Sequence, residues 1–218
     1  MKSSSTPDLS YDRAIALAEH NVSRETISRL DAFVALLLEW QATTNLIAPS
    51  TIREVWTRHV GDSLQLLKHA PNASTWVDLG SGGGFPGIVI ACALEGSAQA
   101  QVHLVESNAK KAAFLREAAR ITGAPAKIHA VRVENFPQFY AGKPDIVMAR
   151  ALAPLPKLLG YVAPFIERGA QAMLLKGQDV DSELTEAAKY WRIEADLVPS
   201  ETDSSGRILI VNALQRLA

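Results

Sequence analysis

The feature that most constrains this chain is a cluster of glycines between a β-rich run and a helical run. The cluster places Gly80, Gly82, Gly83, Gly84 and Gly87 within eight positions, with TWVDL before it and IVIACAL after it. Glycine lets a backbone turn sharply and approach a ligand, because no Cβ stands in the way. The pattern predicts a strand, a tight ligand-binding loop and a helix in succession.

From about residue 75 onward, short β-rich runs alternate with helical runs. Such alternation predicts βαβ units and a parallel sheet covered on both faces. The last two β-rich runs, IEADLVPS and RILIVNALQ, are separated only by ETDSSG, so they should form an antiparallel hairpin at the sheet edge. We therefore predict an α/β, Rossmann-like, seven-stranded sheet with a terminal antiparallel hairpin, the arrangement of class I methyltransferases.

The first part of the chain has a helical pattern instead. Residues 1 to about 7 should form a frayed tail, and an N-terminal helical extension should follow, so that the chain divides into residues 1–70 and a ligand-binding domain at 71–218. One apolar stripe on a helix carries this prediction, at Leu30, Phe33, Val34, Leu37 and Leu38. Pro49 is expected to stop that helix. After a turn, Leu64 and Leu67 are expected to lie in a further helix.

Composition excludes several classes of protein. The 218 residues suit one α/β domain with a modest appendage, and the formal net charge of −1 gives no general basic surface for nucleic acid. The single cysteine, Cys92, excludes a disulfide framework and lies in an apolar run, so it should be a buried thiol. No apolar stretch approaches the ~20 residues of a membrane span. We expect a cytoplasmic protein without a metal site or a membrane partner.

The glycine loop allows two ligands. Gly82, Gly84 and Gly87 match the dinucleotide pattern G-x-G-x-x-G, which would permit a nicotinamide cofactor. However, Asp78 precedes the first glycine by two residues, where an acid would repel a pyrophosphate and suit the cationic amino-acid end of S-adenosylmethionine. Pro86 also removes an N–H from the first helical turn that a phosphate would use. S-adenosylmethionine is therefore the favoured ligand, bordered by Asp78, Gly80 and Gly82.

Further site residues follow from the carboxyl ends of the strands, where open α/β sheets bind ligands. Glu106 is expected to accept both ribose hydroxyls. Val133 and Glu134, after the third strand, should border the adenine. Arg150, at the end of DIVMAR, should open the loop that faces the transferable methyl group.

The motifs together resemble one family. They are Asn45-Leu46, the segment RHVGDS at residues 58–63, DLGSGGGFPGIVIA, ESNAKKAAFL, RVENF, DIVMARALA and LLKG. From about residue 30 onward the chain is similar to the RsmG (GidB) family of guanine-N7 methyltransferases of small-subunit ribosomal RNA. The resemblance implies S-adenosylmethionine contacts at Gly80, Phe85, Val133, Glu134 and Arg150, and a guanine in the decoding region of 16S ribosomal RNA as substrate. Two positions depart from the commoner pattern, with Glu106 in place of a frequent aspartate and Leu152 in place of a frequent phenylalanine.

The residues fit methyl transfer to N7, which carries a free lone pair and no proton. No general base is needed, so none is named, and alignment of the reactants becomes the main task. The loop after Arg150 reads ALAPLP and lacks the Asn-Pro-Pro-Tyr type motif of enzymes that methylate exocyclic amines.

Ribosomal RNA would need a local basic rim. Its candidates, besides the preferred Arg58, His59, Lys110, Arg150 and Lys176, are Arg53, Lys111, Arg116, Arg120, Arg132 and Arg207. The partner would be 16S ribosomal RNA or the small ribosomal subunit, met by a monomer. The helical A form hides the groove edge that carries N7, so the target should lie in a loop or an open strand.

Two other functions remain open from the residues alone. A small-molecule methyltransferase could use the same fold, with the N-terminal helices as a lid over the cleft. An NAD-dependent oxidoreductase would explain the G-x-G-x-x-G match, but not the position of Asp78. A non-catalytic binding module is disfavoured by the intact glycine loop.

Overall fold

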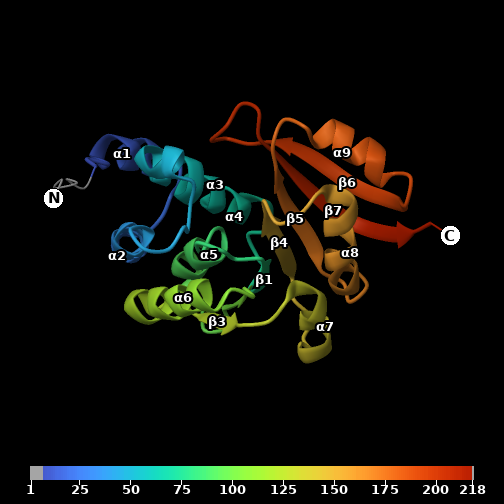
Figure 1. Cartoon of the computed structure of the whole chain (residues 1–218), viewed down its shortest axis with the longest axis horizontal. Helices are drawn as coiled ribbons and strands as arrows, with labels where there is room; N and C mark the ends of the chain where they lie inside the picture. Colours follow the sequence, from blue (N-terminus) through green and yellow to red (C-terminus); the bar gives the residue numbers. More distant parts are fainter. Residues whose placement is uncertain (1–6, 218) are drawn as a thin grey trace.

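The computed structural model describes residues 7–217 and centres on one seven-stranded sheet (Figure 1). The strand order is β3-β2-β1-β4-β5-β7-β6. The strands are β1 (Thr75–Leu79), β2 (Gln101–Val105), β3 (Ala126–His129), β4 (Ile146–Arg150), β5 (Gln171–Lys176), β6 (Trp191–Pro199) and β7 (Arg207–Arg216). The first five pair in parallel, and β7 lies antiparallel between β5 and β6. The predicted α/β sheet and its terminal hairpin are confirmed.

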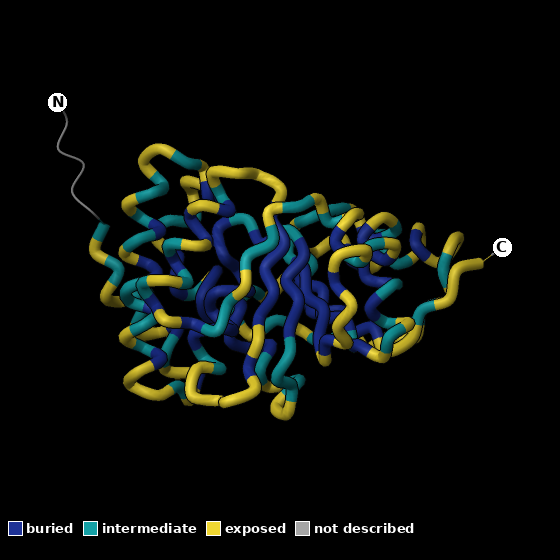
Figure 2. Tube along the Cα trace, turned by 90° about the horizontal axis from the view of Figure 1, so that it is seen from below, coloured by how far each residue is buried: buried dark blue, intermediate teal, exposed yellow. Residues whose placement is uncertain are grey.

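The central strands are buried on both faces because their apolar side chains alternate between two clusters. On β4, Ile146 and Met148 join one cluster, whereas Val147 and Ala149 join the other. Strands with this pattern are covered by helices on both sides. Figure 2 shows the centre of the sheet as buried, with exposed segments around it.

Different helices cover the two faces of the sheet. The first face carries α5 (Gly87–Leu94) and α6 (Ala109–Thr122), with α2 (Arg24–Gln41) packed outside them. The other face carries α8 (Leu155–Ile166), against which α9 (Val180–Ala187) packs. Two short elements, η3 (Val133–Asn135) and α7 (Phe136–Phe139), follow β3.

The N-terminal segment is helical, as predicted. It consists of α1 (Ser10–Ala18), α2, η1 (Pro49–Glu54), the π-helical turn η2 (Trp56–Gly61), α3 (Asp62–Leu64) and α4 (Leu66–His69). Ser23 caps α2 by accepting a hydrogen bond from the Thr26 amide. Of the predicted apolar stripe, Leu30, Phe33, Val34 and Leu37 are buried, and Leu38 is partly buried.

Two predicted boundaries were wrong. Pro49 does not stop the preceding helix, because α2 has already ended at Gln41; Pro49 instead begins η1, where its fixed φ suits a first helical position. The Gln41 side chain accepts from the Leu46 and Ile47 amides and so holds the turn that follows the helix. The run DSELTEAAKYWR, residues 181–192, has a helical pattern through Arg192, but α9 ends at Ala187 and Trp191 pairs in β6.

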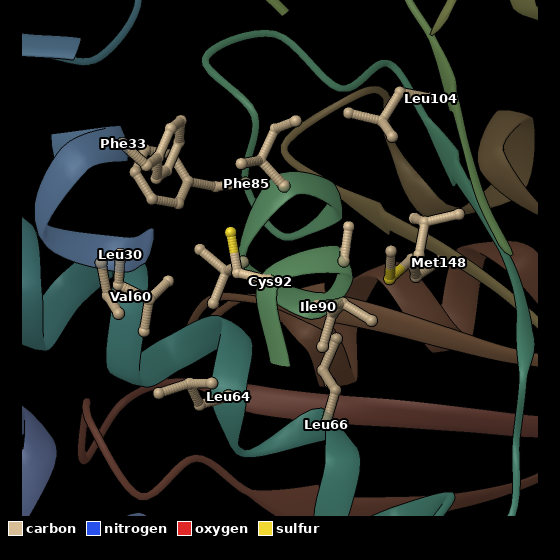
Figure 3. Close-up of a cluster of buried hydrophobic side chains, with 14 of the residues drawn as sticks. Leu30, Phe33, Val60, Leu64, Leu66, Phe85, Ile90, Cys92, Leu104 and Met148 are labelled. Carbon is tan, nitrogen blue, oxygen red and sulfur yellow. The ribbon is translucent and has the colours of Figure 1, made fainter. Parts of the chain in front are cut away.

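The N-terminal helices and the sheet share one core. A single cluster of buried side chains includes Leu30 and Leu66 from these helices together with Trp76 and Met148 from the sheet. Figure 3 shows Phe33 facing Phe85, which belongs to the glycine loop. Cys92 lies in the same cluster, as expected for a structural thiol, and burial raises its pKa to about 12. The N-terminal helical segment therefore packs against the sheet through a shared hydrophobic core.

Two further observations concern residues 7–217 only. No helix in that range is both long and apolar enough to cross a bilayer. The same range contains no group of three or more His, Cys, Asp or Glu side chains that could hold a metal ion.

Replacement of Phe33 should test the shared core. Its ring is fully buried and lies 5.2 Å from Phe85 and 6.2 Å from Phe114, between ring centroids. Phe33→Ala should lower the free energy of unfolding by about 3–5 kcal/mol, because it leaves a cavity in the core. The exposed Glu39 on the same helix provides the control, since Glu39→Ala should change it by less than about 0.5 kcal/mol. Denaturant titration measures both, and a loss below about 1 kcal/mol for Phe33→Ala would contradict the shared core.

Candidate functional site

The predicted site residues meet at the carboxyl edge of the sheet. The glycine loop follows β1, Glu106 follows β2, and Arg150 ends β4. These three strands are adjacent and parallel, so their carboxyl ends lie side by side. Two hollows open there. The first, which we name the glycine-loop pocket, has a volume of about 280 Å³, and the second, the hairpin pocket, about 440 Å³.

The glycine loop is held against β2. The amides of Gly80 and Ser81 both donate to the Val105 carbonyl, at 2.9 and 3.0 Å. Gly80 has a φ of +74°, a conformation that glycine adopts without strain. A Cβ at Gly83 would stand 2.8 Å from the Leu46 carbonyl oxygen, so the N-terminal segment approaches the loop backbone directly. The loop therefore presents a bare backbone to the pocket beside it.

The glycine-loop pocket collects most of the predicted cofactor residues. Its lining is Leu46, Gly80, Ser81, Gly82, Gly83, Phe85, Glu106, Ser107, Lys111, Val133, Arg150, Ala151 and Leu152. The buried Glu106 carboxylate accepts from the Gly82 amide at 2.9 Å and the Asn108 amide at 2.7 Å. These two bonds fix the carboxylate at the edge of the pocket and leave it lone pairs for a diol.

The pocket residues fit S-adenosylmethionine. A bare glycine backbone admits a close ligand, Glu106 offers acceptors for ribose hydroxyls, and Val133 offers an apolar surface for adenine. The Arg150 guanidinium adds a positive charge at the edge of the same pocket.

Asp78 occupies a different place from the one expected. Its side chain is wholly buried and does not line the glycine-loop pocket. One oxygen, Oδ2, accepts from the Gly87 amide at 3.1 Å, whereas Oδ1 has no hydrogen-bond partner among the described residues. Burial raises the pKa of this carboxyl to about 7. Asp78 therefore braces the turn from the loop into α5, and its predicted contact with the cofactor stays a prediction.

Arg150 stands between the two pockets and lines both of them. Its guanidinium carbon lies 5.3 Å from the centroid of the Phe85 ring, a cation–π contact. Its Nη1 donates to the Arg58 carbonyl at 3.2 Å and lies 3.6 Å from Asp62 Oδ2. Burial lowers the pKa of Arg150, but the guanidinium stays charged at any physiological pH. The side chain is thus a fixed positive charge at the junction.

The hairpin pocket lies between η2, the loop of the β6–β7 hairpin and the end of β5. Its lining is Leu46, Ile47, Ala48, Thr51, Arg58, His59, Asp62, Arg150, Ala151, Leu175, Lys176, Gly177, Ser200, Thr202, Asp203, Gly206 and Arg207. Arg58, Lys176 and Arg207 add positive charge to it. Arg58 faces Asp203 at 3.6 Å, and Lys176 is paired with Glu183 at 2.6 Å. Leu46, Arg150 and Ala151 line both pockets, so the two hollows adjoin.

His59 lines the hairpin pocket but does not add charge to it. Burial is the main reason that its pKa falls to about 3, so the imidazole is neutral at neutral pH. The Thr51 hydroxyl donates to the Ala48 carbonyl, so His59 Nε2 must be the donor in its 2.8 Å bond to Thr51 Oγ1. The ring packs on Phe85 at 4.9 Å between centroids. His59 therefore supports Phe85 and the pocket wall rather than a basic rim.

Other predicted residues lie outside both pockets. Lys110 is exposed at the start of α6 and lines neither pocket. Glu134 is exposed, accepts from the Tyr161 hydroxyl at 2.9 Å and faces Arg132 at 3.6 Å, whereas its neighbour Val133 lines the glycine-loop pocket. Among the other rim candidates, Lys111 lines that pocket and Arg207 lines the hairpin pocket. The remaining candidates, Arg53, Arg116, Arg120 and Arg132, are exposed and line neither.

Sequence reasoning missed the residues that close the hairpin pocket. Asp62 and Leu46 belonged to motifs that carried the resemblance, but no role followed from those motifs. Thr202 and Asp203 lie in the ETDSSG segment, which was expected only to connect two strands. The one feature of the sequence that could have indicated this role is the number of small polar residues in the loop, since a tight hairpin turn requires fewer of them.

The sequence is similar to those of known proteins. The model of the family described as rRNA small subunit methyltransferase G (GidB) matches residues 26–206. A protein named ribosomal RNA small subunit methyltransferase G, from Bradyrhizobium sp. (strain ORS 278), is 57% identical and covers 96% of this chain and 94% of its own length. The protein of the same name from Rhodopseudomonas palustris (strain BisB18) is 55% identical, with 98% and 92% covered.

Solved structures resemble the chain in fold. An O-methyltransferase from Bacillus cereus in complex with SAH has a TM-score of 0.61 at 15% identity, with 93% of this chain and 99% of that one covered. A putative O-methyltransferase from Klebsiella pneumoniae also has a TM-score of 0.61 at 15% identity, with 93% and 96% covered. These likenesses concern the Rossmann-like methyltransferase fold.

A methyl group added at Gly80 should close the glycine-loop pocket. The new Cβ would stand 2.5 Å from Leu152 Cδ1, and φ is +74° there. Because Leu152 lines the same pocket, the methyl group would displace its side chain into the ligand space, and we expect Gly80→Ala to weaken S-adenosylmethionine binding about tenfold or more in calorimetry. Gly96→Ala is the matched control, because its φ is +96° but its Cβ would meet no atom within 4 Å. Unchanged affinity in Gly80→Ala would remove the ligand from this loop.

The buried carboxyl of Asp78 should make stability depend on pH. Its pKa is about 7 in the folded protein and 3.8 as an unperturbed group, so the folded state holds an extra proton between these values. Stability is therefore lost as pH rises through that window. Asp78→Asn lacks this proton, so its unfolding free energy relative to wild type should increase from about pH 4 to about pH 8, by up to roughly 4 kcal/mol. Denaturant titrations across pH measure the difference, and a flat difference would show that Asp78 is ionised throughout.

Proposed function

Because the chain belongs to the rRNA small subunit methyltransferase G family, we propose that it methylates N7 of a guanine in the decoding region of 16S ribosomal RNA. The chain is a methyltransferase, and S-adenosylmethionine is its methyl donor. The observation that carries the proposal is the pair of adjoining pockets that share Arg150, one walled by the glycine loop and one by basic side chains.

The glycine-loop pocket would hold the methyl donor. Glu106 would accept the ribose hydroxyls, Val133 would pack on the adenine, and the loop backbone would lie along the amino-acid portion. When bound, S-adenosylmethionine supplies a methyl group on a positively charged sulfur. The contribution of the protein is to fix the direction of that group, since an in-line displacement depends mainly on alignment.

The hairpin pocket would take the guanine. It adjoins the donor pocket at Leu46, Arg150 and Ala151, so a base held there can turn one edge toward the methyl group. The same edge of guanine carries N7 and O6, which are both acceptors. Arg150 could donate to O6 while N7 keeps its lone pair for the methyl group. The ring gains a positive charge on methylation, and the carboxylates of Asp62 and Asp203 line the pocket that holds it.

Local charge would bind the RNA backbone. The chain has a formal net charge of −1, yet Arg58 and Arg207 line one pocket, where Lys176 is already paired with Glu183. A few phosphate contacts of this kind give weak, salt-dependent binding to naked RNA. A folded ribonucleoprotein would add contacts by shape, so we propose the small ribosomal subunit as the physiological partner, met in the cytoplasm by a monomer.

Nucleoside analysis of methylated RNA tests the function. Labelled S-adenosylmethionine is incubated with the protein and with either small ribosomal subunits or protein-free 16S RNA, each unmodified at the decoding region. We expect label in 7-methylguanosine, and loss of label with Arg150→Ala. Label in another nucleoside would overturn the N7 assignment. An unlabelled RNA, with S-adenosylmethionine binding intact, would favour a small-molecule acceptor, whose binding should not depend on salt.

A further inference from the structure

The carboxylate of Asp62 is placed between two parts of the site that are far apart in sequence. Its side chain is 18% exposed, at the junction of η2 and α3. Oδ1 accepts from Gln65 Nε2 at 2.7 Å and from Thr202 Oγ1 at 3.1 Å, with Ser200 Oγ at 3.5 Å. Oδ2 faces Arg150 Nη1 at 3.6 Å. Each oxygen therefore serves a different partner.

The Oδ1 contacts belong to an anchor for the hairpin loop. The buried Gln65 side chain accepts from the Glu201 amide at 2.9 Å and donates to Ser200 Oγ at 3.2 Å. Lys68 forms an ion pair with Glu201 at 2.6 Å on the exposed side of the loop. The loop contributes Ser200, Thr202 and Asp203 to the wall of the hairpin pocket. Without the bonds to Asp62 Oδ1 and Gln65, this wall would be held by the ends of β6 and β7 and by the two ion pairs Arg58–Asp203 and Lys68–Glu201.

The Oδ2 contact fixes Arg150. Within residues 7–217, Asp62 is the one carboxylate with an oxygen within 4.0 Å of this guanidinium, and Oδ2 is the oxygen that faces it. The Arg150 side chain is only 19% exposed, so water replaces a lost partner poorly. The guanidinium also contacts the Phe85 ring and the Arg58 carbonyl, and both are uncharged. A carboxylate in this position selects one orientation of a residue that lines both pockets.

We propose that Asp62 is a positioning residue for methyl transfer, with Oδ2 orienting Arg150 at the junction of the pockets and Oδ1 anchoring the hairpin loop that walls the acceptor pocket. The inference rests on the proposed function. The two carboxylate oxygens have different roles. Oδ2 controls the alignment of the reactants through Arg150, and Oδ1 controls the shape of the acceptor pocket through the hairpin loop. The two effects are separable by substitution.

Asp62→Asn removes the charge that faces Arg150 and keeps an oxygen that can accept from Thr202 and Gln65. With both substrates saturating, kcat should fall about tenfold to a hundredfold, because a small misplacement at the reacting groups is costly. The KM for small ribosomal subunits should change by less than about threefold, because the loop anchor survives. The double substitution Ser200→Ala, Thr202→Val instead removes the loop hydroxyls that contact Asp62 Oδ1 and keeps the charge that faces Arg150. It should raise that KM by roughly threefold or more and leave kcat within about twofold.

A double-mutant cycle tests whether Asp62 acts through Arg150. Arg150→Gln alone should reduce kcat, and adding Asp62→Asn to it should cause no further loss, since the partner is already gone. Independent, multiplying losses would overturn the positioning role. Lys68→Met is the matched control, because it removes an exposed ion pair from the same loop and should leave kcat and KM unchanged.

Hydrogen exchange of the unliganded protein tests the anchor without any activity. The Ser200→Ala, Thr202→Val variant should exchange the amides of residues 201–206 faster than wild type, whereas Asp62→Asn should match wild type there. Faster exchange in Asp62→Asn would show that the carboxylate is only structural and overturn the division between its oxygens. If wild type methylates no RNA, the proposed function fails, yet the exchange result still decides the anchor.

Discussion

The parallel pairing of β1 with β2 and β4 is the constraint on which the rest of the site depends. It brings the segments after these strands to one edge of the sheet: the glycine loop, Glu106 and Arg150. The Val105 carbonyl then holds the loop by accepting from both Gly80 and Ser81, and Glu106 accepts from Gly82. A ligand pocket follows from this backbone geometry before any side chain specific to RNA is considered.

The second pocket depends on segments outside that parallel core. The N-terminal helices bring Arg58 and Asp62, and the antiparallel hairpin brings Thr202 and Arg207. Hydrogen bonds from the hairpin loop to Asp62 and Gln65 join the two. In the proposed function, the parallel core would hold the methyl donor, and these additions would form the pocket for the acceptor. A chain with almost no net charge can in this way present a locally positive site.

Much of this structure could be predicted from the sequence, because strand and helix periodicity and glycine placement are local signals. All seven strands were predicted, as was the convergence of Glu106, Val133 and Arg150 on one pocket. The prediction that Pro49 stops α2 was wrong, because the helix ends at Gln41, whose side chain accepts hydrogen bonds from the amides of Leu46 and Ile47 in the turn that follows. The burial of Asp78, the neutral state of His59 and the role of the hairpin loop depend on contacts between distant segments, which periodicity does not encode. Lys110 was chosen for its motif, and it lies in neither pocket.

The central claim is that donor and acceptor occupy adjoining pockets that meet at Arg150. A crystal structure of the protein with S-adenosylhomocysteine and a short guanine-containing RNA tests this most directly. We expect the adenosine against Glu106 and Val133, and a guanine in the hairpin pocket with its N7 edge turned toward the sulfur beside Arg150. A guanine seated outside the hairpin pocket, with the sulfur facing another opening, would contradict it.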